Sequence, residues 1–266
     1  MPFLSRVNIY PIKSLDGIGV DAAKVLPSGA LEHDREFAIF DEQGRLVNGK
    51  RTAQVHRLQS SFDLSAGTIS HQVHGRDRQK TFRIDDDRQD LELWLGEYFG
   101  FRVELRRIPL GLPDHGLTPG PSVISTASLE KACEWFDHIG VSQTRQRFRA
   151  NLEIAGVPAF WEDGLIGQPN MVREFQIGDV RFESVCPCER CVVPSRDSRT
   201  GIGYRGFQRL LATKRKETLP SWSPLSSFRH FYYFGVLTRV PLFEPGKVLK
   251  VGDQVRFQAP LQQTRT

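Results

Sequence analysis

The sequence predicts a mainly β protein that carries a few helices. Short runs of aliphatic, β-branched and aromatic residues recur along the 266 residues, and clusters of Gly, Pro, Asp and Ser separate them. Strands of this length at such spacing are typical of β-barrels and β-sandwiches. Three longer segments depart from the pattern, and we expect them to be helices.

The first 108 residues are expected to be mostly strands. Among them, residues 90–99 place Leu91, Leu95 and Tyr98 on one helical face, and Gly100 is suited to end that helix. The expected strands are residues 4–11, 19–26, 36–40, 58–64, 68–73 and 101–108. This half therefore supplies one helix and several short strands.

A segment rich in Pro and Gly, residues 109–120, is the best candidate for a domain boundary. Beyond it we expect a helix at 128–138, with Ser128 as its N-cap, and a second helix at 207–216. The strands expected after the boundary are residues 122–125, 147–154, 172–177, 180–185, 231–237 and 254–258. No internal repeat or low-complexity tract interrupts this order.

The composition is that of an ordinary globular protein, with 39% hydrophobic and 25% charged residues. No stretch approaches the roughly 20 apolar residues of a membrane helix, and the N-terminus lacks a secretory pattern. The net charge of +5 is spread along the chain rather than gathered in a basic tract. We therefore expect no membrane span, no nucleic-acid partner and a cytoplasmic location; the positive bias suits a solvated surface or a small anionic ligand.

The strongest local signal for chemistry is a cysteine cluster, Cys186, Cys188 and Cys191, which lies within six residues. Cysteines that staple a fold with disulfides are spread along the chain, whereas clustered ones indicate metal or redox chemistry. A thiolate needs a lowered pKa to act as a ligand, and a neighbouring cation such as Arg190 can supply that.

From the residues alone, four interpretations of the cluster remain open. A zinc site wants four tetrahedral ligands, but the cluster offers three at most. Cys188 and Cys191 form a CxxC pair, yet the Val-Val-Pro that follows starts no helix, as redox pairs normally do. The three thiols could simply be buried. Finally, Cys191 could be a single ligand for a soft metal.

Several separated motifs together resemble the MOSC superfamily with its N-terminal β-barrel domain, which includes the mitochondrial amidoxime-reducing component and its bacterial homologues. The motifs are YPIKS at 10–14, DREF at 34–37, STASL at 125–129, FRANL at 148–152, CERCVVPSRDSRTG at 188–201, FG at 234–235 and LKVGD at 249–253. They occur in the family's order and cover nearly the whole chain. The resemblance implies an N-terminal β-barrel domain at 1–115 and a MOSC β-barrel domain with flanking helices at 116–260.

The resemblance also implies a molybdenum cofactor, a molybdopterin with its metal, bound between the two domains. Cys191 matches the catalytic cysteine that ligates molybdenum. The residues that match cofactor-binding positions are Lys13, Ser14 and Arg35 for the terminal phosphate, Arg149 and Asn151 for the pterin pocket, and Arg190 beside the metal ligand. A lysine, an arginine and a hydroxyl are a suitable clamp for a phosphate dianion.

The implied activity is the reduction of small N-hydroxylated compounds. The chain has no C-x4-C-x2-C pattern for an iron–sulfur cluster, so electrons would come from a separate ferredoxin- or flavin-type protein. Two alternatives stay open: a sulfur carrier that uses Cys186, Cys188 and Cys191, and a zinc-stabilised β module without enzymatic activity. The chain departs from the family pattern at Cys186, an extra thiol, and at Arg199, where relatives carry an acid, which would change the charge of the site.

Overall fold

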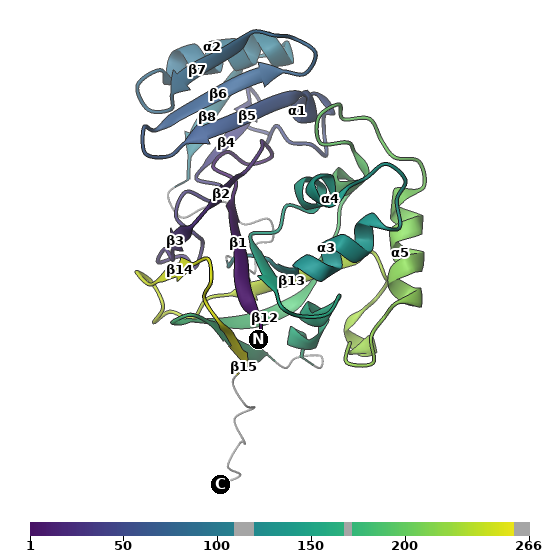
Figure 1. Cartoon of the computed structure of the whole chain (residues 1–266). Coiled ribbons are helices and arrows are strands. Elements are labelled where there is room, and N and C mark those ends of the chain that lie inside the picture. Colours follow the sequence, from purple (N-terminus) through teal and green to yellow (C-terminus); the bar gives the residue numbers. More distant parts are fainter. Residues whose placement is uncertain (109–119, 168–171, 258–266) are drawn as a thin grey trace.

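The computed structural model describes residues 1–108, 120–167 and 172–257 (Figure 1). The mainly β fold class is confirmed. Within these ranges the strands up to residue 108 are β1 (Phe3–Ile9), β2 (Ile18–Val20), β3 (Ala22–Lys24), β4 (Phe37–Asp41), β5 (Leu58–Asp63), β6 (Thr68–Val73), β7 (Gln79–Arg83) and β8 (Val103–Arg107). The later strands are β9 (Val123–Ser125), β10 (Leu152–Ala155), β11 (Arg173–Ile177), β12 (Val180–Glu189), β13 (Tyr233–Arg239), β14 (Val248–Lys250) and β15 (Val255–Phe257).

The helices are fewer and mostly short. They are α1 (Gln54–Arg57), α2 (Arg88–Phe99), α3 (Thr126–Cys133), α4 (Val141–Phe148) and α5 (Phe207–Glu217), with 3-10 turns at Trp161–Leu165, Val193–Ser195 and Leu225–Ser227. None of the helices in the described ranges combines the length and the apolar character needed to span a bilayer.

The largest sheet closes into a barrel. Its strands run in the order β15-β11-β12-β13-β9-β10-β1-β2. Beyond that order, the Leu4 N–H of β1 donates to the Asp253 carbonyl at 2.8 Å and the Gly252 N–H donates to the Leu4 carbonyl at 2.8 Å. These bonds join β1 to the chain that enters β15, so the sheet has few unpaired edges left. Its interior is filled by large apolar side chains, among them Leu4, Phe175 and Phe182.

Residues 37–107 form a second packed unit on top of this barrel (Figure 1). β4 pairs with β8, β5 to β7 form a three-stranded sheet, and α2 packs with them around a core that includes Leu58, Ile69 and Leu91. β1, β2 and β3, however, pair with β10, β1 and β14, so the N-terminal segment also completes the larger sheet. The domain division at 115/116 stays a prediction, because it falls outside the described residues.

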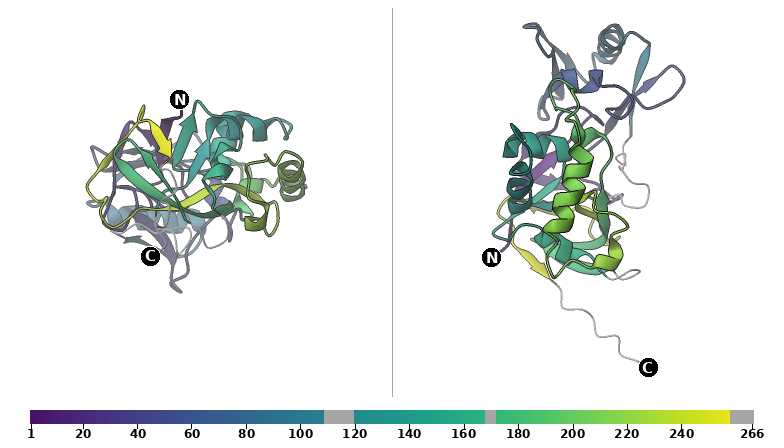
Figure 2. Two further views of the ribbon diagram at one scale, coloured as in Figure 1. Left: turned by 90° about the horizontal axis from the view of Figure 1, so that it is seen from below. Right: turned by 90° about the vertical axis from the view of Figure 1, so that its right-hand side faces the viewer.

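Helices α3, α4 and α5 cover one side of the barrel, and Figure 2 shows α5 lying along it. A third apolar cluster joins them to the sheet. Its aromatic rings are close: the Phe136 and Phe207 centroids lie 4.3 Å apart, and those of Phe148 and Phe234 lie 4.2 Å apart. This packing fixes the end of α4, where four residues that line the site described below lie, Gln146 to Arg149.

The expected strand at 147–154 is wrong. α4 continues to Phe148, Arg149 reverses the chain with a φ of 55°, and β10 begins only at Leu152. The apolar spacing of Phe148, Leu152 and Ile154 spans a helix end and a strand start, and the mostly polar α4 gives little helical periodicity of its own. The family motif FRANL is therefore a helix-to-strand turn.

Other boundaries shift for local reasons. The expected helix at 128–138 is α3, which starts earlier because Ser125 is its N-cap and accepts the Ser128 N–H at 3.1 Å. The expected strand at 19–26 divides into β2 and β3, since the two halves pair with different strands. α1, α4, β7 and β14 were not expected from the sequence.

Candidate functional site

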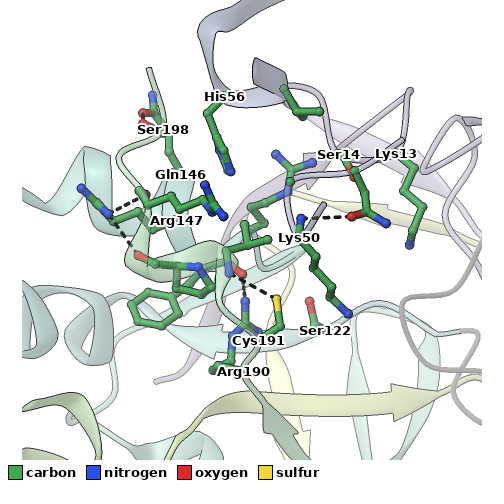
Figure 3. A pocket seen from close by; sticks show the side chains of 18 of the residues that line it. Lys13, Ser14, Lys50, His56, Ser122, Gln146, Arg147, Arg190, Cys191 and Ser198 are labelled. Atoms are coloured by element: carbon green, nitrogen blue, oxygen red, sulfur yellow. Dashed lines mark hydrogen bonds between the residues drawn. The ribbon is translucent and has the colours of Figure 1, made fainter. Parts of the chain in front are cut away.

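A cavity of about 440 Å³ opens between the N-terminal segment and the barrel, and Figure 3 shows its lining. Most of the residues singled out by the motifs line it together: Lys13, Ser14, Arg35, Arg149, Arg190 and Cys191. They come from the turn after β1, the turn before β4, the end of α4 and the end of β12. Positions separated by more than 150 residues in sequence therefore meet in one pocket.

Cys191 lies just past the end of β12, at the start of the cysteine loop, residues 190–206. Its thiol is partly exposed in the cavity, and its Sγ accepts the Val193 N–H at 3.5 Å. The Tyr232 hydroxyl donates to the Cys191 carbonyl at 2.9 Å. Burial raises the pKa of Tyr232 to about 12, so this donor keeps its proton. The backbone of Cys191 is thus held while its sulfur faces the cavity.

β12 is longer than expected and carries the other two thiols of the cluster. It extends to Glu189, with irregular pairing to β13 around Pro187. Cys188 is buried and lines the cavity. Cys186 is not part of the described lining, and burial, followed by the nearby Cys188 and Glu189, raises the pKa of its thiol.

Arg190 connects this strand to α4. Its guanidinium donates to Cys188 Sγ at 2.8 Å and to the Phe148 carbonyl, and it lies 5.4 Å from the centre of the Phe148 ring. Adjacency in the sequence suggested that Arg190 acts on the sulfur of Cys191, but in the structure its guanidinium donates to the sulfur of Cys188. The Arg190 side chain therefore supports the wall of the cavity beside both thiols.

The turn after β1 and the turn before β4 present the next group. Ser14 and Arg35 both adopt left-handed backbone conformations, with φ of 76° and 50°. The Lys13 N–H donates to the Phe37 carbonyl at 2.8 Å, which ties the two turns together. Left-handed residues other than glycine are uncommon and concentrate at functional sites. The left-handed conformations of Ser14 and Arg35, on two turns joined by a hydrogen bond, are typical of a ligand-binding site.

Asn151 does not line the cavity; it lies behind Arg35. It is 2% exposed, and its Oδ1 accepts hydrogen bonds from Arg35 at 3.1 Å and from the Ser122 N–H at 3.2 Å. Its amide donates to the Asn8 carbonyl at 3.0 Å. The side chain is fully used within the protein, so its contribution to the cavity is to hold Arg35 in place.

Tyr10 forms an aromatic base beneath two of the cations. The Arg149 guanidinium lies 4.1 Å from the centre of the Tyr10 ring, and that of Arg35 lies 4.9 Å away. Burial raises the pKa of the Tyr10 hydroxyl, although Arg149 and Arg35 oppose the shift. The neutral ring favours cations over its face.

The cavity is strongly cationic. Seven lysine and arginine side chains line it, against the two carboxyl groups of Asp16 and Glu189. Burial raises the pKa of Asp16, while the Ser60 N–H and Arg149 oppose the shift. His56 also lines the cavity, and its pKa is lowered to about 4, first by burial and then by Arg149 and Arg196. At neutral pH the imidazole is therefore uncharged, and the cavity is suited to an anionic ligand.

Sequence reasoning missed several lining residues, notably Lys50, His56, Gln146 and Arg196. Figure 3 shows Lys50 reaching toward Ser122, and His56 pointing into the cavity from the N-terminal segment. Lys50 and His56 lie in a turn and a short helix that no motif marked. Arg196 lies inside the cysteine motif, but its spacing gave no sign that it faces the cavity. Arg199, by contrast, is exposed and is not part of the described lining.

The zinc alternative finds no ligand set in the part of the chain that the structure describes. There, no three His, Cys, Asp or Glu side chains come together in a way that could hold a metal ion. A tetrahedral zinc site needs four such ligands. The soft ligands in the described lining are the thiols of Cys188 and Cys191, and the Cys188 sulfur already accepts a hydrogen bond from Arg190.

Comparison with known proteins gives two family matches. A model described as the MOSC N-terminal beta barrel domain matches residues 1–101, and one described as the MOSC domain matches residues 120–256. Together they leave only the segment around 101–120 and the C-terminal end unmatched.

Curated relatives are similar over most of the chain. Mitochondrial amidoxime reducing component 2 of Bos taurus is 24% identical over 95% of this chain and 82% of its own length. Molybdenum cofactor sulfurases of Caenorhabditis briggsae and Danio rerio are each 24% identical, over 97% and 84% of this chain but 36% and 30% of their own lengths. The chain thus spans about a third of the length of these sulfurases.

Proposed function

The chain belongs to the MOSC family, with that family's N-terminal β-barrel domain, and from this premise we propose that it binds molybdenum cofactor through Cys191 and reduces N-hydroxylated compounds. Its relatives are proteins named for molybdenum cofactor and for amidoxime reduction. One relative that is matched over most of both chains is an amidoxime reducing component, which favours the reductase.

The observation that carries the proposal is the position of one thiol among many cations. Cys191 Sγ faces the same cavity as Lys13, Arg35 and Arg149. A pterin cofactor with a terminal phosphate is anionic, and a thiolate is a good ligand for a soft metal. A cavity of about 440 Å³ lies within the usual size range of cofactor and ligand sites.

The residues present fit such a group. Lys13, Ser14 and Arg35 would hold its phosphate, because they combine two cations and a hydroxyl donor on adjoining turns. Arg149, stacked on Tyr10, and Arg190, fixed at the wall, would lie along the rest of it, while Asn151 would keep Arg35 oriented. Molybdenum, when bound, supplies the exchange of electrons with the substrate.

The overall reaction is balanced by two electrons and two protons. The N–O bond of the substrate breaks, its oxygen leaves as water, and the nitrogen is reduced. The donor protein supplies the electrons and solvent supplies the protons. The chain contributes the Cys191 thiolate, a Val193 N–H that stabilises negative charge on that sulfur, and cations that neutralise the bound anion.

The electrons would come from a separate ferredoxin- or flavin-type protein. All four cysteines are free of disulfides, and no metal-ligand cluster occurs among the described residues. A second redox centre held by this chain therefore has no support from that part of the structure. Free thiols fit a reducing compartment such as the cytoplasm.

The first test is the metal content of protein produced in a host that makes molybdenum cofactor. Elemental mass spectrometry gives molybdenum, zinc and iron per chain for the wild type, Cys191→Ala and Cys133→Ala. Cys133 is a matched control, because it is a partly exposed thiol at the end of α3 that is not part of the described lining. We expect about one molybdenum per chain in the wild type and the control, and a large loss in Cys191→Ala with the fold retained.

Activity is then measured with an amidoxime and dithionite-reduced methyl viologen as the electron donor. Reduction by the wild type and the Cys133→Ala control, absent in folded Cys191→Ala, is the expected result. If the wild type contains molybdenum but reduces no amidoxime, hydroxamate or hydroxylamine, the proposal of cofactor binding stands and the proposal of reductase activity is refuted. Zinc in place of molybdenum would refute both.

A second candidate function, sulfur transfer, is favoured by Cys188. This thiol lines the cavity beside Cys191 and accepts a hydrogen bond from the Arg190 guanidinium at 2.8 Å. Several relatives are named as sulfurases. In this case Cys188 would carry a persulfide taken from a sulfur donor. Mass spectrometry after incubation with a persulfide donor tests it: a gain of one sulfur on Cys188 would support transfer, and an unmodified Cys188 would exclude it.

A further inference from the structure

Arg196 lines the cavity with a backbone that is held by hydrogen bonds and a guanidinium end that is not. Its backbone is fixed: its N–H donates to the Val193 carbonyl at 3.0 Å, and its carbonyl accepts from the Arg147 guanidinium at 2.5 Å. Its side chain lines the cavity, and its Nε atom is buried with no hydrogen-bond partner among the described residues, as are those of Arg147 and Arg190. The guanidinium ends of Arg147 and Arg190 donate to backbone carbonyls, whereas that of Arg196 makes no hydrogen bond or ion pair within the described ranges. A buried guanidinium nitrogen without an acceptor is unfavourable, because it has lost water and gained nothing.

Arg147 shows the contrast. It lines the same cavity, but its guanidinium donates to the Pro194 carbonyl at 3.0 Å and pairs with Asp197 at 3.3 Å. These contacts of Arg147 hold the cysteine loop in place. The side chain of Arg196, which belongs to that loop, makes no hydrogen bond or ion pair among the described residues.

The two carboxyl groups of the cavity do not neutralise Arg196. Glu189 pairs with His230 at 3.2 Å, and Asp16 accepts the Ser60 N–H at 2.8 Å. The neighbour that Arg196 does influence is His56, which stays uncharged at neutral pH. The wall formed by Arg196 and His56 thus offers a charged donor and a neutral ring, and no carboxylate of the described residues pairs with that donor.

We propose that Arg196 binds an anionic substituent of the substrate, so that this protein prefers N-hydroxylated compounds that carry a carboxylate or a phosphate. The inference rests on the proposed reductase function for the reaction, but the anion site follows from the cavity itself. The planar guanidinium matches either oxyanion through paired hydrogen bonds. Arg196 and Cys191 line the same cavity on either side of the 3-10 turn Val193–Ser195, so an anion held at Arg196 leaves the rest of a small molecule in the cavity that contains the proposed metal ligand.

The test compares two probes that differ by one carboxylate group: benzamidoxime and 4-carboxybenzamidoxime. Their dissociation constants are measured by calorimetry on cofactor-loaded wild type, Arg196→Gln and Arg199→Gln. Arg199 is the matched control, because it lies in the same loop but is exposed and not part of the described lining. We expect Arg196→Gln to weaken 4-carboxybenzamidoxime about 10- to 100-fold, in line with a lost charged hydrogen bond. Benzamidoxime should bind both variants as it binds the wild type.

Three outcomes overturn the proposal. One is equal binding of the two probes by the wild type, or no binding of 4-carboxybenzamidoxime. Another is a carboxylate preference that Arg196→Gln retains or that Arg199→Gln abolishes. The third is a loss of molybdenum from Arg196→Gln, which would assign the residue to the cofactor. Because binding is read without turnover, a failure of the reductase proposal appears separately, as probes that bind but are not reduced.

Discussion

The Arg35 guanidinium donates to the side-chain oxygen of Asn151 at 3.1 Å, across 116 residues of sequence. This bond joins the N-terminal turn to the start of β10. Asn151 also bonds to Ser122 and Asn8, so one buried amide fixes three segments around the cavity. Its effect on the site is therefore indirect: it orients a cation rather than touching a ligand.

Replacement of Asn151 by Ala should destabilise the protein and weaken cofactor retention together. The Arg35 guanidinium, the Ser122 N–H and the Asn8 carbonyl each lose a buried partner, at an expected total cost of about 1–3 kcal/mol in the free energy of unfolding. Urea denaturation and molybdenum content measure the two effects. Ser70→Ala, which removes an exposed side-chain hydrogen bond to Thr81, is the control and should change neither. Full cofactor occupancy in Asn151→Ala would show that Arg35 needs no support.

Gly201 should be the least replaceable glycine of the cysteine loop. Its φ is +73°, and a Cβ placed on it would lie 2.6 Å from the Ala53 carbonyl oxygen, so alanine is strained and the loop must move from the N-terminal segment. Gly201→Ala is expected to lower the free energy of unfolding by about 1–3 kcal/mol. Gly203→Ala, two residues further in the same loop with open space around it, should be close to neutral. Equal melting temperatures for the two variants would contradict this account.

The sequence predicted those parts of the fold that depend on local pattern. β6 has the bounds expected from its alternation, and α2 buries Leu91 and Leu95 and ends at Gly100 in the left-handed conformation. Elements stabilised mainly by distant contacts were missed. Helix α4 is mostly polar, and Phe148 at its end is fixed by packing against Phe234 from β13.

The same distinction holds for the candidate site. Motif residues such as Lys13 and Cys191 were located from sequence, and the fold brings them to one cavity. Lys50, His56 and Arg196 were not found, because their position depends on how the turn near Gly49 packs on the cysteine loop. No spacing rule describes that contact between two loops.

The stability of the protein should fall in acid in part because of two histidines. Burial lowers the pKa of His71 to about 3, and burial with Arg149 and Arg196 lowers that of His56 to about 4, both from 6.5. Below pH 6.5 the unfolded chain therefore takes up protons that the folded chain does not, so each histidine costs up to about 1.4 kcal/mol per pH unit. Above pH 6.5 this cost is absent. Glu162 acts in the opposite sense, since burial raises its pKa to about 7 and its protonated form favours the fold.

The contribution of one histidine is isolated by difference. Urea denaturation between pH 7 and pH 4.5 should give a shallower acid slope for His71→Gln than for the wild type, whatever the stability of the variant at pH 7. Ser70→Ala, which removes only an exposed hydrogen bond to Thr81 and no titratable group, is the control and should keep the wild-type slope. Parallel slopes for His71→Gln and the wild type would show that His71 takes up its proton in the folded state.

Arg147 should be more important for holding the cysteine loop than for binding ligands. Its side chain is 4% exposed, donates to the Pro194 and Arg196 carbonyls and pairs with Asp197, so Arg147→Gln leaves these groups without their buried donor. We expect a loss of about 3–5 kcal/mol in the free energy of unfolding, as for other broken buried pairs. Arg83→Gln, which breaks the ion pair with Asp86 in which both side chains are largely exposed, is the matched control and should cost less. Because Arg147 positions the loop that carries Cys191, limited proteolysis of Arg147→Gln should show new cleavage within residues 190–206. A variant that resists cleavage there as the wild type does would mean that Val193–Ser195 and the Asp197 turn hold the loop without Arg147.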